Sequence, residues 1–292
     1  MSKIERIAES LRLFTRLSGF AGFLLLSITT LVLLRAFELC SRRRIDRTTL
    51  VNSYCAGLCR MLGMRIQTHG LPMEGSALRV CNHVSWTDIP ILAAGLPLRF
   101  LAKREVASWP LIGWIARQVG TIFVKRGAGD SAAVRQTLVS ALEAGESILV
   151  FPEGTTTAGE GVRPFHPRLL GAAIAARCPV QAITIAYHRD GQPDRLVPFV
   201  GDDEFVAHLC RLLRKPAVRV DVMFHPPLAV SVSDSHRELA RTLHQQVSQG
   251  LETLREKHEG EGSVPVFCHK RFAGQTPDCA SDTETYQVVS TQ

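Results

Sequence analysis

The sequence predicts an α/β fold in which a mixed or mostly parallel sheet is flanked by helices and preceded by an N-terminal pair of helices. Short apolar, β-branched runs alternate with stretches of helical periodicity from residue 66 onward, as in sheets that helices cover on both faces. An uncharged apolar run precedes this region, and after residue 259 polar residues dominate without periodicity. We therefore expect N-terminal helices at 1–64, an α/β domain at 65–258 and a disordered tail at 259–292.

The uncharged run Leu17–Leu34 has 18 residues, close to the roughly 20 that a full membrane span needs. A second helical pattern follows at 48–63, with Gly63 as its stop. The two patterns predict a membrane-anchoring helical hairpin, whose first helix either spans the bilayer or lies within one leaflet. A cleaved signal peptide and a buried core helix are the alternatives. Basic residues flank the run on both sides and suit an anionic leaflet; they are Lys3, Arg6, Arg12, Arg16, Arg42, Arg43, Arg44 and Arg47.

The basic charge of the chain is confined to this N-terminal segment. The 292 residues carry a formal net charge of +7, and residues 1–65 hold 11 Lys and Arg against 4 Asp and Glu. Residues 66–292 hold 23 residues of each sign. A nucleic-acid-binding domain would usually spread basic residues over its folded body, so we expect no nucleic-acid partner. The eight cysteines form no CxxC pair, which favours a reducing, cytosolic setting for the body.

The elements of the body are expected in alternation. Pro90 suits the first turn of one helix, and Gly145 ends another. Strands are predicted at 78–81, 99–102, 120–124, 147–151, 180–187 and 218–224. Helices are predicted at 89–94, 111–118, 131–144, 169–177 and 235–254.

The motif Asn82–Asp88 follows the first of these strands directly and precedes a helix. A strand-to-helix turn places side chains at the carboxyl edge of the sheet, where α/β proteins build sites. On a continuous helix His83 and Asp88 would point about 140° apart, but through a turn the carboxylate folds back onto the imidazole. The pair then forms a base oriented by an acid, with a nucleophile supplied by the substrate. For this motif alone, a purely structural His–Asp pair is the alternative.

Two further strand ends carry candidate anion-binding residues. Phe151–Thr155 describes an exposed turn with free backbone N–H groups and hydroxyls, which suits an anion. Lys125 and Arg126 stand together at the end of an apolar strand, and an arginine binds phosphate in a bidentate manner. Lys103 and Arg104 follow another short strand. A solvated strand end is the alternative for each segment taken alone.

Together these segments form an ordered series: H-x4-D at His83–Asp88, G-x-I-F-x-x-R at Gly120–Arg126, and F-P-E-G-T at Phe151–Thr155. The series resembles the glycerolipid acyltransferase family, and most closely its bacterial 1-acylglycerol-3-phosphate acyltransferases. The resemblance covers residues 65–230 and the N-terminal helices, so it implies an acyltransferase domain at 65–258. Two segments depart from the family pattern: Gln181 stands where proline is usual, and Arg163–Arg168 replaces a Phe-Lys-x-Gly type of sequence. These departures leave the acceptor open.

The resemblance implies transfer of an acyl chain from acyl-CoA or acyl-carrier protein to the free hydroxyl of a lysolipid. The main expectation is 1-acyl-sn-glycerol 3-phosphate as acceptor, giving phosphatidic acid; lyso-ornithine lipid or another lysophospholipid is the alternative. His83 is the expected general base and Asp88 its orienting acid. The acceptor head group is expected to contact Arg126, Glu153, Gly154 and Thr155, with Lys125 and Lys103 assisting and Glu153 orienting Arg126 or a glycerol hydroxyl.

No metal or cofactor is expected, and the predicted location is the bacterial inner membrane with the catalytic domain on its cytoplasmic side. Two remote alternatives come from other classes. A metal-dependent hydrolase would use His83 and Asp88 as ligands, but the sequence shows no convincing third ligand. A non-catalytic lipid-binding module would not need both residues.

Overall fold

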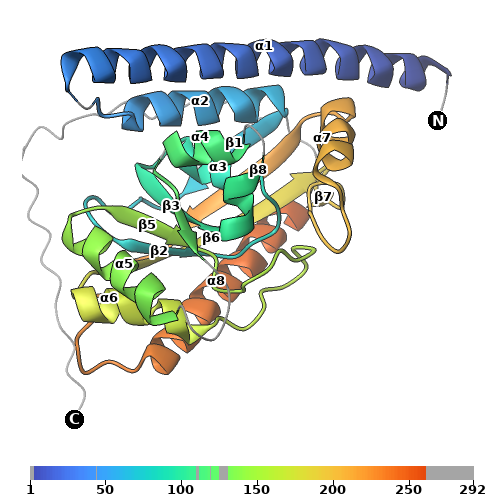
Figure 1. Cartoon of the computed structure of the whole chain (residues 1–292). Helices are drawn as coiled ribbons and strands as arrows, with labels where there is room; N and C mark the ends of the chain where they lie inside the picture. The colour runs from blue at the N-terminus through green and yellow to red at the C-terminus, as the bar shows by residue number, and fades with distance from the viewer. Residues whose placement is uncertain (1–2, 44, 110–111, 119, 125–130, 261–292) are drawn as a thin grey trace, which may run out of the picture.

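The computed structural model describes residues 3–43, 45–109, 112–118, 120–124 and 131–260, and it confirms the predicted fold class. A mixed sheet has the strand order β1-β8-β6-β2-β5-β3-β4, and β7 pairs with β6 outside this path (Figure 1). The strands are β1 (Met64–His69), β2 (Leu78–Cys81), β3 (Leu98–Lys103), β4 (Ile122–Val124), β5 (Ser147–Val150), β6 (Val180–Arg189), β7 (Gln192–Pro193) and β8 (Val218–Phe224).

Five neighbouring strands, β6, β2, β5, β3 and β4, run parallel. β8 is antiparallel to β6, and β1 is parallel to β8. All four residues of β2 and of β5 are buried, and most of them are apolar, as expected for strands covered on both faces. Because parallel strands end at the same edge, the segments that follow β2 and β5 lie close together.

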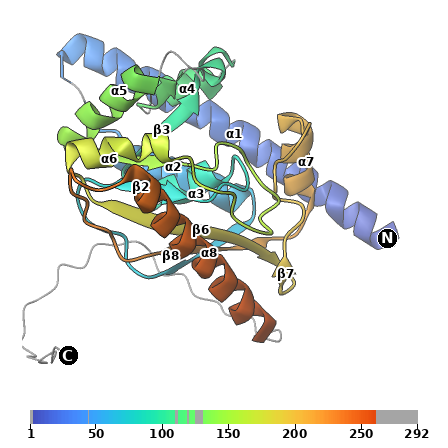
Figure 2. The ribbon, with the colours of Figure 1, turned by 90° about the horizontal axis from the view of Figure 1, so that it is seen from below.

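Helices cover both faces of the sheet (Figures 1 and 2). Cys59, Leu92 and Leu213 belong to the apolar core on one face, where α2, α3 and α7 pack. Leu138 and Leu243 belong to the core on the other face, where α5, α6 and α8 pack. The body helices are α2 (Thr48–Met61), α3 (Asp88–Ala93), α4 (Ile112–Gln118), α5 (Ser131–Glu143), α6 (Gly171–Ala176), α7 (Phe205–Arg214) and α8 (His236–Gly260), with 3-10 helices at Arg104–Ser108 and Pro167–Leu169.

The expected N-terminal hairpin is present as two packed helices. α1 (Lys3–Ser41) is 39 residues long and extends beyond both ends of the apolar run. It lies along α2, where the ring of Phe23 is 5.4 Å from that of Tyr54 (Figure 1). A Cβ at Gly57 would come within 3.1 Å of Phe23, so glycine permits this close approach. α2 ends before Gly63, which has a φ of +74° and is the stop that the sequence predicts.

The N-terminal part of α1 also contacts the body. Lys215 Nζ donates a hydrogen bond to Glu9 at 2.7 Å, and its backbone carbonyl accepts one from the Arg16 guanidinium at 2.9 Å. The first helix therefore rests on α2 and on the segment after α7 along much of its length.

Most predicted elements agree with the structure to within two residues, but three elements were missed. β1 has only one fully buried residue and carries Arg65, Gln67 and His69, so its apolar signal is weak. α7 is a short helix of 10 residues, and β7 has only two. α8 continues to Gly260, six residues beyond the predicted end. The predicted disorder of the tail concerns residues that, from 261 onward, lie outside those the structure describes.

Candidate active site

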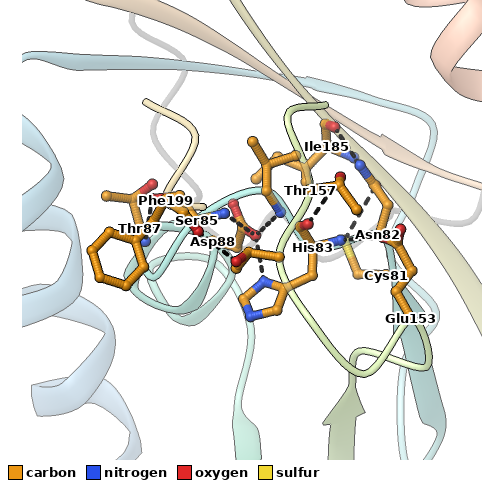
Figure 3. A network of polar contacts seen from close by, with 12 residues as sticks. Cys81, Asn82, His83, Ser85, Thr87, Asp88, Glu153, Thr157, Ile185 and Phe199 are labelled. Carbon is orange, nitrogen blue, oxygen red and sulfur yellow. Dashed lines mark hydrogen bonds and ion pairs between the residues drawn. The ribbon is translucent and has the colours of Figure 1, made fainter. Parts of the chain in front are cut away.

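The turn after β2 brings His83 and Asp88 together, as the spacing predicts. The Nδ1 atom of His83 lies 2.8 Å from Oδ2 of Asp88 (Figure 3). Asp88 is the first residue of α3, and its backbone N–H donates to the carbonyl of Ser85 at 3.1 Å. This backbone bond closes the chain into a tight turn. The carboxylate therefore reaches back over five residues to the imidazole.

The carboxylate of Asp88 is fully buried and surrounded by hydrogen-bond donors. Oδ2 also accepts the backbone N–H groups of Val84 at 2.8 Å and Ser85 at 3.1 Å. Oδ1 accepts the hydroxyl of Tyr187 at 2.5 Å. Burial and the Asp88 charge raise the pKa of Tyr187 well above its ordinary value, so the phenol remains a donor. These donors compensate for removing the charge from water and fix the carboxylate in one orientation.

The imidazole of His83 is oriented but accessible. An ionised carboxylate at Nδ1 selects the tautomer with its proton on that atom, which leaves Nε2 with a free lone pair. The ring stacks on Phe151, with centroids 3.9 Å apart and planes inclined by 14°. The side chain of His83 is 19% exposed, and Nε2 faces away from the polar network in Figure 3. An imidazole held in this way can act as a general base toward a hydroxyl that reaches its exposed nitrogen.

Hydrogen bonds to two neighbouring segments hold the turn in place. Asn82 bonds twice to the backbone of Ile185 in β6: Nδ2 donates to its carbonyl at 2.9 Å, and Oδ1 accepts its N–H at 2.8 Å. The side chain thus continues the β2–β6 ladder beyond its last backbone pair. On the other side, Thr157 donates its backbone N–H to the carbonyl of His83 at 2.8 Å.

Glu153 supports the turn through its buried carboxylate. It is 3% exposed; Oε1 accepts the backbone N–H of His83 at 2.7 Å, and Oε2 accepts that of Arg163 at 2.8 Å. Burial raises the pKa of Glu153, and these two N–H groups oppose that rise. A buried carboxylate needs donors, and these two backbone groups supply one to each oxygen. Arg126 lies outside the described residues, so the expected role of Glu153 in orienting Arg126 or a glycerol hydroxyl remains a prediction.

Gly154 and Thr155 directly follow Glu153 in the chain. Gly154 has a φ of +75°, and a Cβ there would lie 3.2 Å from Cδ2 of His166. The position therefore requires glycine for its backbone conformation and for close contact with His166. Thr155 is exposed, as a residue that contacts a substrate must be. The head-group roles of these two residues remain predictions.

The structure describes only one of the three basic residues that are expected to contact the head group. Lys103 is the last residue of β3 and pairs with Val124, the last residue of β4. Both strands end at the edge where β2 and β5 end, since all four are parallel. Lys125 and Arg126 lie outside the described residues, so their contacts with a head group remain predictions.

Gln181, a departure from the family pattern, has a structural role away from His83. It lies at the second position of β6, paired with Arg79 near the opposite end of β2. Its Oε1 accepts the N–H of Met73 at 2.9 Å and a guanidinium N–H of Arg79. Its Nε2 donates to the carbonyls of Leu71 and His225, each at 3.0 Å. Gln181 therefore fixes the loop before β2 and gives no information about the acceptor. The second departure from the family pattern is the segment 163–168. It adjoins the site, because Arg163 contacts Glu153 and His166 lies next to Gly154.

Comparisons with known proteins agree with this geometry. The acyltransferase family model matches residues 65–186, which include the His83 and Glu153 motifs. A lyso-ornithine lipid O-acyltransferase of Pseudomonas aeruginosa is 45% identical over 205 residues, 70% of this chain and 79% of the relative. A protein of the same name from Brucella abortus is 38% identical over 220 residues, 70% of this chain and 82% of the relative.

Two further matches are more distant. A 1-acyl-sn-glycerol-3-phosphate acyltransferase of Neisseria meningitidis is 30% identical over 163 residues, 55% of this chain and 64% of the relative. The crystal structure of the 1-acyl-sn-glycerophosphate acyltransferase PlsC from Thermotoga maritima has a TM-score of 0.60 at 20% identity, and the match covers 90% of this chain and all of that one. This likeness shows a shared fold. With the motifs, the fold and identities of this extent, the chain belongs to the glycerolipid acyltransferase family.

Proposed function

We propose that this acyltransferase uses lyso-ornithine lipid as its acceptor. The observation that carries the proposal is the 45% identity to the Pseudomonas aeruginosa enzyme of that name over 79% of its length. The relative named for 1-acyl-sn-glycerol 3-phosphate matches less of this chain at lower identity. The acceptor that the sequence alone placed second therefore becomes the first candidate, and 1-acyl-sn-glycerol 3-phosphate becomes the runner-up.

The proposed reaction needs no covalent enzyme intermediate. His83 Nε2 takes the proton of the acceptor hydroxyl as its oxygen attacks the thioester carbonyl carbon of acyl-CoA or acyl-carrier protein. The resulting tetrahedral intermediate collapses as the C–S bond breaks, and the leaving thiolate takes the proton back from the imidazolium. Asp88 stabilises the imidazolium between these steps. An oriented base of this kind contributes roughly 10²–10⁴-fold, and holding both substrates in place contributes more.

A groove beside the catalytic turn offers charges of both signs for the acceptor head group. It has a volume of about 440 Å³, and its lining includes Glu160, Arg195, Asp203 and Arg211. The groove adjoins the turn on two sides. Ala158, in its wall, directly follows Thr157, and Pro198 and Val200 flank Phe199, whose N–H donates to the Val84 carbonyl at 3.0 Å.

The charges of this groove suit a zwitterion. Asp203 and Arg211 pair with each other at 3.1 Å. Arg195 and Glu160 are exposed and make no ion pair among the described residues. An ornithine head group presents a carboxylate and an ammonium ion, which Arg195 and Glu160 would receive. A phosphate monoester would meet the arginine but would be repelled by Glu160.

Replacing Arg195 by alanine is therefore expected to raise KM for lyso-ornithine lipid about 10-fold, as expected for loss of one charge-assisted hydrogen bond. KM for the acyl donor should change little. Initial rates measured at varied acceptor and then at varied donor concentration check this expectation. Arg241→Ala is the matched control, since Arg241 is exposed on α8 outside the groove lining. An equal rise in both KM values would contradict a head-group role for Arg195.

The exposed apolar surface supports a location at the membrane, with α1 lying in one leaflet. Among the described residues, 11 of the 17 large hydrophobic side chains that are exposed belong to α1, including Phe14, Leu25 and Leu33. α1 is the described helix that is long and apolar enough to cross a bilayer. Because it packs along α2 and the body, we propose that it lies flat and holds the site at head-group depth. Acyl-CoA and acyl-carrier protein are cytoplasmic donors, which favours the cytoplasmic face.

Salt extraction separates this mode of attachment from a purely electrostatic one. Membranes that carry the full chain should retain the protein in about 1 M salt, a concentration that screens interactions between surface charges. Replacing Phe14, Leu25 and Leu33 together by serine should release it into the supernatant while its circular dichroism spectrum stays unchanged. Release of the unmodified protein by salt would contradict the apolar attachment of α1.

Product identification tests the proposed acceptor. Purified full-length protein is incubated with labelled acyl-CoA and, in separate reactions, lyso-ornithine lipid or 1-acyl-sn-glycerol 3-phosphate, and the lipids are separated by chromatography. The proposal expects labelled ornithine lipid as the main product. Labelled phosphatidic acid as the main product would restore the runner-up acceptor.

A further inference from the structure

A second polar cluster lies away from the catalytic turn, around Asp221 in β8. This carboxylate is fully buried. His258, near the end of α8, places Nε2 2.9 Å from Oδ2 of Asp221. His69, at the end of β1, places Nε2 2.7 Å from Oδ1. His188, in β6, places Nδ1 3.5 Å from Oδ2. Three imidazoles from three different elements therefore converge on one carboxylate.

His188 is the unusual member of this cluster. It is 3% exposed, and its Nδ1 atom has no hydrogen-bond partner among the described residues. Its ring lies 4.0 Å from that of His258, measured between centroids. Leaving a buried polar atom without a partner costs free energy, so such atoms are rare and need an explanation. A ligand that uses the lone pair of Nδ1 supplies one.

We propose that His188, Asp221 and His258 bind a zinc ion. One ligand atom from each of the three lies within 4.8 Å of the others. Zinc bonds to imidazole nitrogen and carboxylate oxygen are about 2.0–2.2 Å long, so neighbouring ligand atoms of a tetrahedral site lie about 3.3 Å apart. The distances of 2.9 Å and 3.5 Å from Asp221 to the two histidines bracket this value. Small adjustments of the side chains would bring all three onto one ion.

The surroundings of the cluster fit a zinc site. His69 hydrogen-bonds the second oxygen of Asp221, as outer partners commonly do for a metal-bound carboxylate. A cavity of about 20 Å³ lies beside the cluster, where His188 helps to line it. Arg219 Nε also lies 3.3 Å from Oδ2 of Asp221. This guanidinium repels a cation, so its removal should tighten zinc binding.

The site would be structural and separate from acyl transfer. Tyr187, which contacts Asp88, and His188 are successive residues of β6 and so point to opposite faces of the sheet. The zinc ligands come from β6, β8 and α8, and the ion would fasten the last turns of α8 to the sheet (Figure 2). No step of the proposed reaction involves this ion, so its test is independent of the acceptor.

Metal titration of the full-length protein tests the proposal. The protein is purified in detergent without a polyhistidine tag, treated with a chelator, and titrated with Zn²⁺ against a chromophoric competitor. We expect about one ion per chain. His188→Gln and His258→Gln should each weaken binding by more than about 100-fold, and His69→Gln by roughly 10–100-fold. His236→Gln is the matched control, because His236 is exposed at the opposite end of α8, and it should bind as the unmodified protein does.

Two further measurements keep the result decisive if a variant folds poorly. Co²⁺ in place of Zn²⁺ should give the visible absorption of a tetrahedral ion with imidazole ligands in the unmodified protein. Zn²⁺ should raise the melting temperature of the unmodified protein and of His236→Gln, but not that of His258→Gln. Absence of stoichiometric binding to the unmodified protein, or equal affinity in the ligand variants, would overturn the proposal.

Discussion

Replacing His83 by alanine is expected to lower kcat/KM for acyl transfer by at least about 10²–10⁴-fold, the contribution of an oriented general base. The imidazole is the group whose lone pair faces outward from the turn, and Asp88 Oδ2 bonds its other nitrogen at 2.8 Å. Without it, the acceptor hydroxyl must lose its proton to water as it attacks the thioester. Initial rates of product formation, measured with purified protein at varied acceptor concentration, give this ratio.

The His83 variant should remain folded. Asp88 keeps three other donors, from Val84, Ser85 and Tyr187, so the loss of one leaves no buried charge unpaired. Circular dichroism and membrane retention should therefore match those of the unmodified protein. His236→Ala serves as the control for loss of an exposed histidine. Full activity in the His83 variant would remove the general base from the mechanism.

The second large effect is expected for Asp88→Asn, which should lower kcat by about 10⁴-fold, as the equivalent change does in serine protease triads. A neutral amide cannot stabilise the imidazolium that forms when His83 takes the proton. Asparagine is a better choice than alanine, because its carbonyl oxygen still accepts the N–H groups of Val84 and Ser85. Alanine would leave these two backbone N–H groups without their acceptor in the core.

The double variant His83→Ala/Asp88→Asn distinguishes a catalytic pair from two independent residues. Asp88 acts through the imidazole, so once the imidazole is gone the second change should cost little. We expect the double variant to be about as active as His83→Ala alone. Losses that multiply would show that Asp88 acts separately from His83, for example by stabilising the fold.

The regular strands of the sheet were predictable because most of their residues are apolar or β-branched, although β2 and β8 also carry the buried charged residues Arg79 and Asp221. β2 and β8 match the predicted bounds, 78–81 and 218–224. β1 was not predictable, since an edge strand with polar residues at alternate positions carries little apolar signal. α7 was not predicted, because 10 residues between two loops give only a short periodic pattern.

The contact between His83 and Asp88 was predictable, but the residues that support it were not. His83 and Asp88 are local, and the strand-to-helix context predicts their contact. Tyr187 lies 99 residues from Asp88 along the chain, and nothing near it in sequence indicates that its hydroxyl reaches the carboxylate. The support that Glu153 gives to the turn was not predictable for a similar reason. A motif shows that a carboxylate is present, whereas its burial against the backbone of His83 and Arg163 depends on the packing of distant segments.

The central claim is that His83 serves as the base for acylation of lyso-ornithine lipid. It is tested most directly by kcat/KM for lyso-ornithine lipid and for 1-acyl-sn-glycerol 3-phosphate, each measured with the unmodified protein and with His83→Ala under the same conditions. The account predicts a higher value for lyso-ornithine lipid in the unmodified protein and the loss of both activities in the variant. A higher value for 1-acyl-sn-glycerol 3-phosphate, or acylation of lyso-ornithine lipid that persists without His83, would contradict it.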